Sequence, residues 1–381
     1  MLLRTKGIPV NIDEDIVGRI TTDATSHDTD SILLCGDEVP DIEKFGGLAI
    51  LTNQKELNLN HTRKVVFKIP ALDHLTDGDL VSIGLDGNIN TLYRVNSYFN
   101  TLLATERCNS NCLMCSQPPR DKNDVPRLYA IYQKLIPLIP KDCFELCISG
   151  GEPTLMGELF FQLLEQIKTE LPGTEVHVLT NGRTFAWNNM ADRLAQIDFK
   201  RLMLGVPVYA DYYQVHDYIV QAKNAFNQTI LGIHNLARYN QRIEIRVVLH
   251  SQSIPRLTKL ARYIYKNLPF AEHVTFMGLE YTGYTVHNID KLWIDPHDYN
   301  NELIEAVEFL AGQGMHVSIY NSQLCVLPER LWKFARKSIS DWKNDYLPQC
   351  ESCTKLNDCG GLFTWNLKKH SQYILPFNDL V

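Results

Sequence analysis

Apolar and polar positions follow two different patterns along the chain. Over residues 1–99, short apolar runs of strand length are separated by turn residues, and residues 75–95 hold two such runs around Asp86-Gly87, a favoured hairpin turn pair. Residues 64–69 have the composition of a further strand. The pattern predicts a β-rich domain over residues 1–99. We expect a scaffold or docking role for it, because it contains no cluster of reactive groups.

From residue 100 onward, apolar runs of strand length alternate with segments of helical spacing. Strands are predicted at 100–105, 144–149, 175–179, 201–206, 243–249 and 273–277. Helices are predicted at 125–139, 156–171, 189–197, 225–239 and 255–267. Repeated strand–helix units favour parallel pairing with right-handed crossovers, and six of them predict an α/β fold with a partial (β/α)6 barrel over residues 100–284.

The pattern loosens after about residue 284. A helix is predicted at 296–310 and a strand at 316–320, and a cysteine-rich tail follows within a C-terminal region of residues 285–381. In barrels of parallel strands, the chemistry lies at the carboxyl ends of the strands. The first cysteines and a glycine pair, Gly150-Gly151, both fall at such ends.

Composition narrows the class of protein. Of the 381 residues, 45% are hydrophobic and 21% charged, as in soluble globular proteins, and the net charge of −7 without a basic run argues against a nucleic-acid binder. The chain has no apolar run of membrane-spanning length and no apolar signal core near its start. We therefore expect a cytoplasmic protein without a membrane partner. Because thiols stay reduced there, clustered cysteines are expected to bind metal.

The first candidate site is the motif of Cys108, Cys112 and Cys115, spaced C-x3-C-x2-C in a loop after a predicted strand. Thiolates are the usual ligands of iron–sulfur clusters. Three of them on a four-iron cluster leave one iron open for a substrate or cofactor. A zinc site, or cysteines placed by chance, are the alternatives.

The second candidate element is SGGEPT, residues 149–154. Gly150 and Gly151 permit positive φ and close approach of a ligand to the backbone, and the carboxylate of Glu152 follows at once. Alone, the segment could be a turn with Thr154 as a helix cap. Beside the cysteine motif it becomes specific.

A third set of residues lies near the C-terminus. Four thiolates, those of Cys325, Cys350, Cys353 and Cys359, would close a coordination shell, which favours a structural or electron-relay 4Fe–4S cluster. A four-cysteine zinc site is the competing interpretation. The other three cysteines of the ten, Cys35, Cys143 and Cys147, are expected to be core residues.

The first two motifs together resemble the radical S-adenosylmethionine (SAM) superfamily. The resemblance implies a catalytic 4Fe–4S cluster whose open iron chelates the amino and carboxyl groups of SAM. It also implies reductive cleavage of SAM to methionine and a 5′-deoxyadenosyl radical that abstracts hydrogen. Gly150, Gly151 and Glu152 would contact the SAM amino group. Met114 would lie beside the adenine, although a plain core methionine is an equal alternative.

Weaker positions follow from the same resemblance. Asn181 ends the third predicted strand, and Arg246 lies in the fifth, where the family often places polar contacts to SAM. Asn181 is also a typical turn residue, and Arg246 could be a buried ion-pair partner. His216 and Glu280 are weaker still and could be surface groups.

The C-terminal run C-x2-C-x5-C resembles part of the SPASM or twitch extensions of peptide-modifying radical SAM enzymes. The last cysteine of that pattern is replaced by Phe363, which argues for one auxiliary cluster. With the segments LLATERCNSNCLMCSQPPRD and SGGEPTL, the chain resembles the C-type radical SAM maturases of the His-Xaa-Ser repeat peptide system. That resemblance implies a ribosomally made precursor peptide as substrate and a second radical SAM maturase as partner. A cellular electron donor is expected as well.

Two other classes remain open. One is a radical SAM enzyme acting on a nucleotide or tRNA, which the low basicity and the cysteine-rich tail disfavour. The other is a non-catalytic iron–sulfur or zinc redox sensor, which would have no use for the glycine–glutamate segment.

Overall fold

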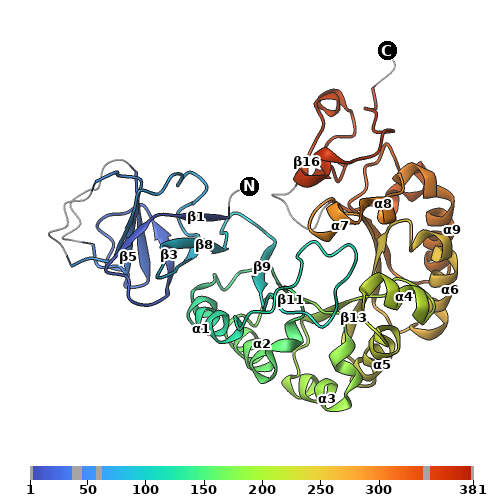
Figure 1. Cartoon of the computed structure of the whole chain (residues 1–381), viewed down its shortest axis with the longest axis horizontal. Coiled ribbons are helices and arrows are strands. Elements are labelled where there is room, and N and C mark those ends of the chain that lie inside the picture. Colours follow the sequence, from blue (N-terminus) through green and yellow to red (C-terminus); the bar gives the residue numbers. More distant parts are fainter. Residues whose placement is uncertain (1–2, 37–44, 57–61, 338–343, 379–381) are drawn as a thin grey trace. The chain divides into compact units, whose positions relative to one another are not determined.

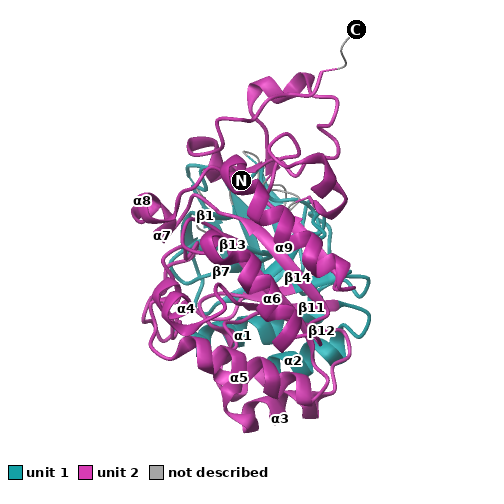
Figure 2. Ribbon diagram, turned by 90° about the vertical axis from the view of Figure 1, so that its right-hand side faces the viewer, with its two compact units in different colours: residues 1–102, 124–146, 162–174 teal, residues 103–123, 147–161, 175–381 magenta. Residues whose placement is uncertain are grey.

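The computed structural model describes residues 3–36, 45–56, 62–337 and 344–378. They form two compact units, coloured in Figure 2: residues 1–102, 124–146 and 162–174 in one, and residues 103–123, 147–161 and 175–381 in the other. In the described part of the chain, no helix is long and apolar enough to cross a bilayer.

The N-terminal part of the chain is an eight-stranded mixed sheet (Figure 1). Its strands are β1 (Arg4–Lys6), β2 (Ile8–Val10), β3 (Ile16–Thr21), β4 (Ser31–Cys35), β5 (Ala49–Thr52), β6 (Val65–Phe67), β7 (Leu80–Ile83) and β8 (Asn88–Tyr93), in the order β1-β8-β7-β3-β4-β5-β6-β2. The run from β3 to β6 is parallel and the other pairs are antiparallel. The predicted β-rich character is therefore confirmed.

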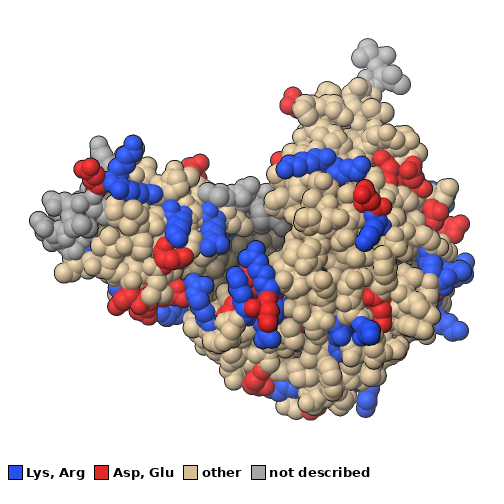
Figure 3. Space-filling view, in the orientation of Figure 1, with Lys and Arg blue, Asp and Glu red and all other residues tan. Residues whose placement is uncertain are grey.

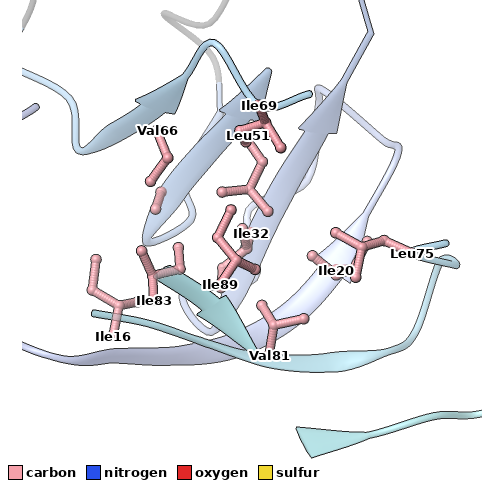
Figure 4. Packing of buried hydrophobic residues seen from close by; sticks show 11 residues of the cluster. Ile16, Ile20, Ile32, Leu51, Val66, Ile69, Leu75, Val81, Ile83 and Ile89 are labelled. Carbon is pink, nitrogen blue, oxygen red and sulfur yellow. The ribbon is translucent and has the colours of Figure 1, made fainter. Parts of the chain in front are cut away.

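The predicted hairpin is the pair β7–β8. The N–H of Gly84 donates to the carbonyl of Asn88 (2.8 Å), and Gly87 has φ +76°, a conformation that favours glycine. Behind the hairpin lies an apolar core of branched residues, shown in Figure 4. Its fully buried members include Ile20, Ile32 and Leu51, so this sheet has a hydrophobic core of its own.

The second sheet carries the candidate site. Its strands are β9 (Asn100–Leu103), β10 (Glu145–Ser149), β11 (Glu175–Leu179), β12 (Leu202–Pro207), β13 (Arg242–Leu249), β14 (His273–Gly278) and β15 (Val317–Tyr320). Their order is sequential, β15-β14-β13-β12-β11-β10-β9, and the pairs from β11 to β15 are parallel. Within the described residues the sheet stays open, so the predicted partial barrel is confirmed. The strand predicted at 316–320 extends it by pairing with β14.

Helices alternate with these strands, as the spacing predicted. They are α1 (Val125–Leu135), α2 (Glu158–Glu170), α3 (Asn188–Ile197), α4 (Tyr213–Val220), α5 (Ala225–Arg238), α6 (Leu257–Asn267), α7 (Tyr284–His287), α8 (Ile289–Leu292) and α9 (Asn300–Gly312). Short 3-10 turns that matter for the site are η3 (Pro153–Met156) and η4 (Arg183–Ala186). Helix α4, which the spacing did not predict, begins directly after the segment that follows β12.

The two faces of the second sheet differ in polarity. Strand β13 alternates, because Ile243, Ile245 and Val247 are buried on the face that the helices cover, whereas Glu244 and Arg246 lie on the other face. The same period places His177 of β11, and His273 and Thr275 of β14, on that second face. The partial barrel therefore has an apolar outside under its helices and a polar inside.

Beyond β15 the chain forms short elements. These are η7 (Glu329–Phe334), β16 (Asn344–Asp345), η8 (Pro348–Ser352), β17 (Leu362–Phe363) and η9 (Thr364–Lys368), and β16 pairs with β17. A small apolar cluster of Val326, Leu362 and Ile374 holds them together. Charge is mixed over the surface: basic and acidic side chains are interspersed on the face seen in Figure 3.

Candidate functional site

The three cysteines of the first motif lie on one loop after β9, which we call the cysteine loop (residues 106–120). Its base is closed by a hydrogen bond from the Arg120 N–H to the Glu106 carbonyl (2.9 Å), and a tight turn joins the Cys115 N–H to the Cys112 carbonyl (3.0 Å). The thiols of Cys108 and Cys115 both act electrostatically on that of Cys112. The loop thus places the three thiols within electrostatic range of one another.

The chemistry of these thiols fits an iron–sulfur cluster. Burial raises the pKa of Cys108 to about 11 and that of Cys112 to about 12, and neighbouring thiols add to both shifts. The metal-free thiols are therefore protonated, and a bound cation would replace their protons. None of the cysteines forms a disulfide. Three thiols are the ligand set of a cluster with one open iron. Among the described residues, no group of three or more His, Cys, Asp or Glu is placed to hold a metal ion, so the three thiols are neighbours and not a preformed coordination shell.

Two segments anchor the loop through its backbone. The last turn of α4 accepts hydrogen bonds at the carbonyls of Val220 and Ile219, from the N–H groups of Asn111 (3.0 Å) and Leu113 (2.9 Å). On another side, the Tyr284 N–H of α7 donates to the Cys115 carbonyl (2.9 Å) and the Asn288 side chain donates to the Leu113 carbonyl (2.9 Å). The loop is thereby held by elements far apart in sequence.

Arg183 and Asn181 bind the part of the loop between Cys108 and Cys112. The guanidinium of Arg183 donates to the Asn109 carbonyl and to the Ser110 hydroxyl (3.0 Å), and it is itself held by Gln228 (2.8 Å). The Asn181 amide donates to the Asn109 side chain (2.6 Å) and lies 3.9 Å from the Cys108 sulfur. Asn181 thus reaches the cysteine loop, as its predicted place at a strand end required.

The glycine pair is explained by the neighbouring strand. The N–H groups of Gly151 and Glu152 donate to the carbonyls of Thr105 and Arg107 (2.8 Å each), which extends the pairing into the start of the cysteine loop. A Cβ at Gly151 would collide with the Arg107 carbonyl, and one at Gly150, which has φ +141°, would lie 2.6 Å from the Thr105 carbonyl. The two glycines therefore permit close approach of protein backbone.

Glu152 is a buried hub between two strand ends. Its Oε1 accepts from the Thr154 N–H (3.1 Å) and from the hydroxyls of Thr154 and Thr180 (2.7 Å each), and its Oε2 accepts from the Asn181 N–H (2.7 Å). Burial raises its pKa, although the hydrogen bonds from Thr180, Asn181 and Thr154 oppose the rise. The side chain is 0% exposed, so it orients the residues around it.

Met114 and Arg246 occupy different surroundings. Met114 is buried in an apolar cluster with Leu113, Tyr209 and Ile219. Arg246 donates to the Glu244 carboxylate (2.8 Å) and to the Met277 sulfur (3.0 Å) on the inner face of the sheet. Both positions agree with the alternatives drawn from sequence, a core methionine and an ion-pair partner. Their contacts to SAM stay predictions.

Glu244 sits at the centre of the polar inner face. Burial alone would raise its pKa, but the hydrogen bond from His273 (3.1 Å) and the charges of Arg246 and His177 lower that pKa to about 2. Gly205 of β12 leaves the room that His177 and Arg246 need, because a Cβ there would lie about 3 Å from each. The carboxylate therefore stays ionised beside Arg246.

The four C-terminal cysteines line one pocket. Cys325, Cys350, Cys353 and Cys359 are among the residues that line a small pocket of about 20 Å³. Burial raises the pKa of Cys325 and Cys350, and neighbouring thiols add to both rises. Phe363, at the position of the missing fourth cysteine of the run, is a buried residue of β17.

Several residues of the site were missed from sequence. Arg183 and Tyr209 carry no motif and follow strand ends that had already been identified. The polar inner-face residues Glu244 and His273 could have been found from sequence. Strands of a parallel sheet usually read as continuous apolar runs, so a polar residue at every second position indicates a polar face.

Comparison with known proteins identifies this part of the chain. Residues 102–264 match the family model of the radical SAM superfamily. An uncharacterized protein of Methanocaldococcus jannaschii, MJ0907, is 22% identical over 191 residues, which are 46% of this chain and 65% of that relative. The chain thus spans just under two thirds of the relative's length.

Three solved structures illustrate the similarity found by comparison of structures. SuiB of Streptococcus suis with bound SAM is 15% identical, with 57% of this chain and 49% of SuiB covered and a TM-score of 0.44. Native anSMEcpe with bound SAM is 18% identical, with 58% of this chain and 63% of anSMEcpe covered and a TM-score of 0.44. A radical SAM methyltransferase of Sphaerobacter thermophilus is 15% identical, with 66% of this chain and 76% of the methyltransferase covered and a TM-score of 0.42.

The chain therefore contains a radical SAM superfamily domain over residues 102–264. Such a domain implies a 4Fe–4S cluster and SAM as cofactors, and the thiols of the cysteine loop fit that cluster.

Proposed function

We propose that this protein is a radical SAM enzyme that cleaves SAM reductively and modifies a ribosomally made peptide. The observation that carries the proposal is that the thiols of Cys108, Cys112 and Cys115 lie within electrostatic range of one another on a loop fixed from several sides. A loop so anchored presents its ligands without further ordering, which lowers the entropic cost of cluster binding.

When bound, the cluster supplies the electron that splits the sulfonium of SAM and so generates the radical that abstracts hydrogen from the substrate. The chain's own residues position the two cofactors. Glu152 orients Asn181 and the glycine pair beside the loop. Arg246 offers a cation on the inner face, and Met114, itself a residue of the loop, packs in the apolar cluster with Leu113 and Ile219.

We propose that the C-terminal pocket binds an auxiliary 4Fe–4S cluster. All four cysteines line this pocket, and Gly361 (φ +65°) lets the backbone turn tightly beside Cys359. A closed four-thiolate shell suits electron relay or structure more than substrate activation. Zinc is the competing occupant, and iron analysis separates the two.

The substrate proposal rests on the sequence resemblance. It names a precursor peptide with His-Xaa-Ser repeats, a second radical SAM maturase acting beside this one, and a cellular electron donor. The N-terminal domain, residues 1–99, would serve as scaffold or docking surface. The barrel domain of residues 100–284 would hold SAM, and residues 285–381 would hold the auxiliary cluster.

Mass spectrometry of a His-Xaa-Ser repeat peptide tests the proposal. The peptide is co-expressed with this protein and the second maturase under anaerobic conditions, with Cys112→Ala as the inactive variant and Cys35→Ala as the matched control. A mass change that requires Cys112 but not Cys35 supports the proposal. An unmodified peptide, together with modification of a nucleotide or tRNA, would reject the peptide substrate.

A further inference from the structure

A small polar pocket lies at the carboxyl ends of the last two strands of the second sheet. Leu279, directly after β14, and Asn321, directly after β15, line it together with Gly360 and Gly361 of the C-terminal region. Among the described residues, no cysteine lines this pocket, although it shares Gly361 with the pocket of the C-terminal cysteines. Its volume is about 10 Å³, which is room for one particle of the size of a water molecule. A ligand as large as an amino-acid residue is therefore excluded.

Two side-chain oxygens of residues that line this pocket are buried without a hydrogen-bond partner in the described part of the chain. They are the Oδ1 atoms of Asn321 and Asn344. Asn321 donates through its Nδ2 to the Gly278 carbonyl (3.5 Å), so the other end of its amide is the oxygen. Asn344 belongs to β16, where it pairs with Phe363. A buried acceptor without a partner costs free energy, so these two atoms point to a ligand.

Two main-chain oxygens approach the same pocket at Gly360. The carbonyl oxygens of Arg336 and Ser322 lie 3.3 and 3.4 Å from the position that a Cβ on Gly360 would take. Within residues 3–36, 45–56, 62–337 and 344–378, no hydrogen bond reaches either oxygen. Because Gly360 has no side chain, the space between it and these carbonyls stays open. The pocket therefore gathers neutral oxygen atoms from the side chains and from the main chain.

Hydrogen bonds fix the walls of the pocket. The Asn366 side chain accepts from the Tyr281 N–H (3.0 Å) and donates to the Leu279 carbonyl (3.0 Å), which joins η9 to the segment after β14. The Gln323 amide donates to the Gly361 carbonyl (2.7 Å), which joins the segment after β15 to the C-terminal region. The walls are therefore in place before a ligand binds, and binding requires little further ordering.

The charge and size of the pocket select the class of ligand. Among the described residues, no Asp or Glu lines it. Ca²⁺ sites usually include carboxylates, and Mg²⁺ keeps several waters for which this pocket has no room. A water molecule has only two protons to donate, so it cannot serve two amide oxygens and two carbonyl oxygens together. Neutral carbonyl oxygens are the usual ligands of K⁺, an ion close to water in size.

We propose that this pocket binds one monovalent cation of the size of K⁺. Its ligands are the side-chain oxygens of Asn321 and Asn344 and the carbonyl oxygens of Ser322 and Arg336. The cation joins the end of β15 to β16 and to the segment after Cys359, and it thereby orders the C-terminal region. The site is independent of the proposed function, because none of its oxygens belongs to a cysteine or to the cysteine loop.

Thermal unfolding of the full chain in KCl tests the inference. Choline chloride, whose cation is too large for the pocket, replaces KCl so that the ionic strength stays constant. Because a ligand that binds only the folded chain stabilises it, the apparent midpoint of the wild type should rise by about 3 °C between about 1 and about 150 mM KCl. Equal midpoints in KCl and in choline chloride would show a water site only and overturn the inference. A rise with CaCl₂ but not with KCl would overturn the assigned class of ion.

A variant of one ligand locates the effect. Asn344→Leu removes one oxygen and keeps the approximate shape of the side chain, and Asn357→Leu, at an exposed position of the same region, is the matched control. The rise with KCl should disappear in Asn344→Leu and persist in Asn357→Leu. The same rise in Asn344→Leu and in the wild type would place the cation elsewhere. Iron content per chain, measured on the same samples, shows that the proteins compared carry the same clusters.

Crystals of the wild type soaked in RbCl give a second test that does not depend on the stability of any variant. Rb⁺ resembles K⁺ in size and charge, and its anomalous scattering locates it directly. A peak of anomalous density between Asn321, Asn344 and Gly360 is the expected result. The absence of such a peak from this pocket would overturn the inference.

Discussion

The main-chain N–H of Asn181 donates a 2.7 Å hydrogen bond to the buried carboxylate of Glu152. This bond joins the end of β11 to the segment that follows β10. The Asn181 side chain then reaches Asn109 on the cysteine loop. The carboxylate therefore acts on the loop through Asn181, and replacing Glu152 should change the position of the loop.

Glu152→Gln should destabilise the metal-free protein. The amide of Gln would point its NH2 donor toward an N–H or O–H group that now donates to the carboxylate. The donor left unpaired lowers the free energy of unfolding by about 1–3 kcal/mol. Urea unfolding measures the loss, with Glu158→Gln, an exposed position on α2, as control. An unchanged unfolding midpoint in Glu152→Gln would show that the hydrogen-bonded hub carries no stability.

Arg183→Ala should loosen the cysteine loop. The guanidinium holds the Asn109 carbonyl and the Ser110 hydroxyl, and without it the thiols lose a fixed position. If the proposed auxiliary cluster is present, we expect the purified variant to retain it and to lose most of the iron of the first cluster, a fall from about eight toward about four irons per chain. Arg193→Ala, on α3, is the control. Full iron content in Arg183→Ala would contradict the role given to this side chain.

Cys359→Ala should distinguish the metal content of the C-terminal pocket from that of the cysteine loop. If the C-terminal pocket binds a four-iron cluster, the variant should lose about four irons per chain and still bind SAM at the cysteine loop. Elemental analysis for iron and zinc provides the measurement. One zinc in place of four irons in the wild type would reject the auxiliary iron–sulfur cluster and leave the first site untouched.

Acid should destabilise the fold through buried histidines. Burial lowers the pKa of His177, His216 and His250 to about 4, from the ordinary value of 6.5. Below pH 6.5 the unfolded chain takes up protons that the folded chain refuses, so stability is complete above that pH and falls as the pH drops toward 4. Each histidine contributes about 1.4 kcal/mol per pH unit in this window.

The variant His250→Gln isolates one of these contributions. Its urea midpoint should fall less steeply with acid than that of the wild type between pH 6.5 and about 4. Parallel curves for the two proteins would mean that His250 is protonated in the folded state.

Much of this architecture could be predicted from local pattern. Strand and helix spacing predicted the open parallel sheet, because its apolar face repeats regularly, and the cysteine motif located the loop. The sequence could not show that Gly151 makes room for the Arg107 carbonyl, since that requires knowing which strands are neighbours. It also could not show that His216, considered as a surface group, is buried against Tyr209.

The residues that hold the loop were missed for the same reason. Arg183 follows Asn181-Gly182 by one position, and nothing in its neighbourhood marks it as a contact of Asn109. Only the parallel pairing of successive strands brings the ends of β10, β11 and β12 to one edge of the sheet. Long-range contacts of this kind depend on the topology of the sheet, which cannot be read from a single sequence.

The most direct test of the account is the release of 5′-deoxyadenosine from SAM by the anaerobically reconstituted protein with dithionite as reductant. We expect release by the wild type and by Cys35→Ala, and none by Cys112→Ala, whose thiol is one of the three proposed ligands of the first cluster. No release by the wild type with a full complement of iron, or release by Cys112→Ala at the wild-type rate, would contradict the assignment of the cysteine loop as the SAM-cleaving site.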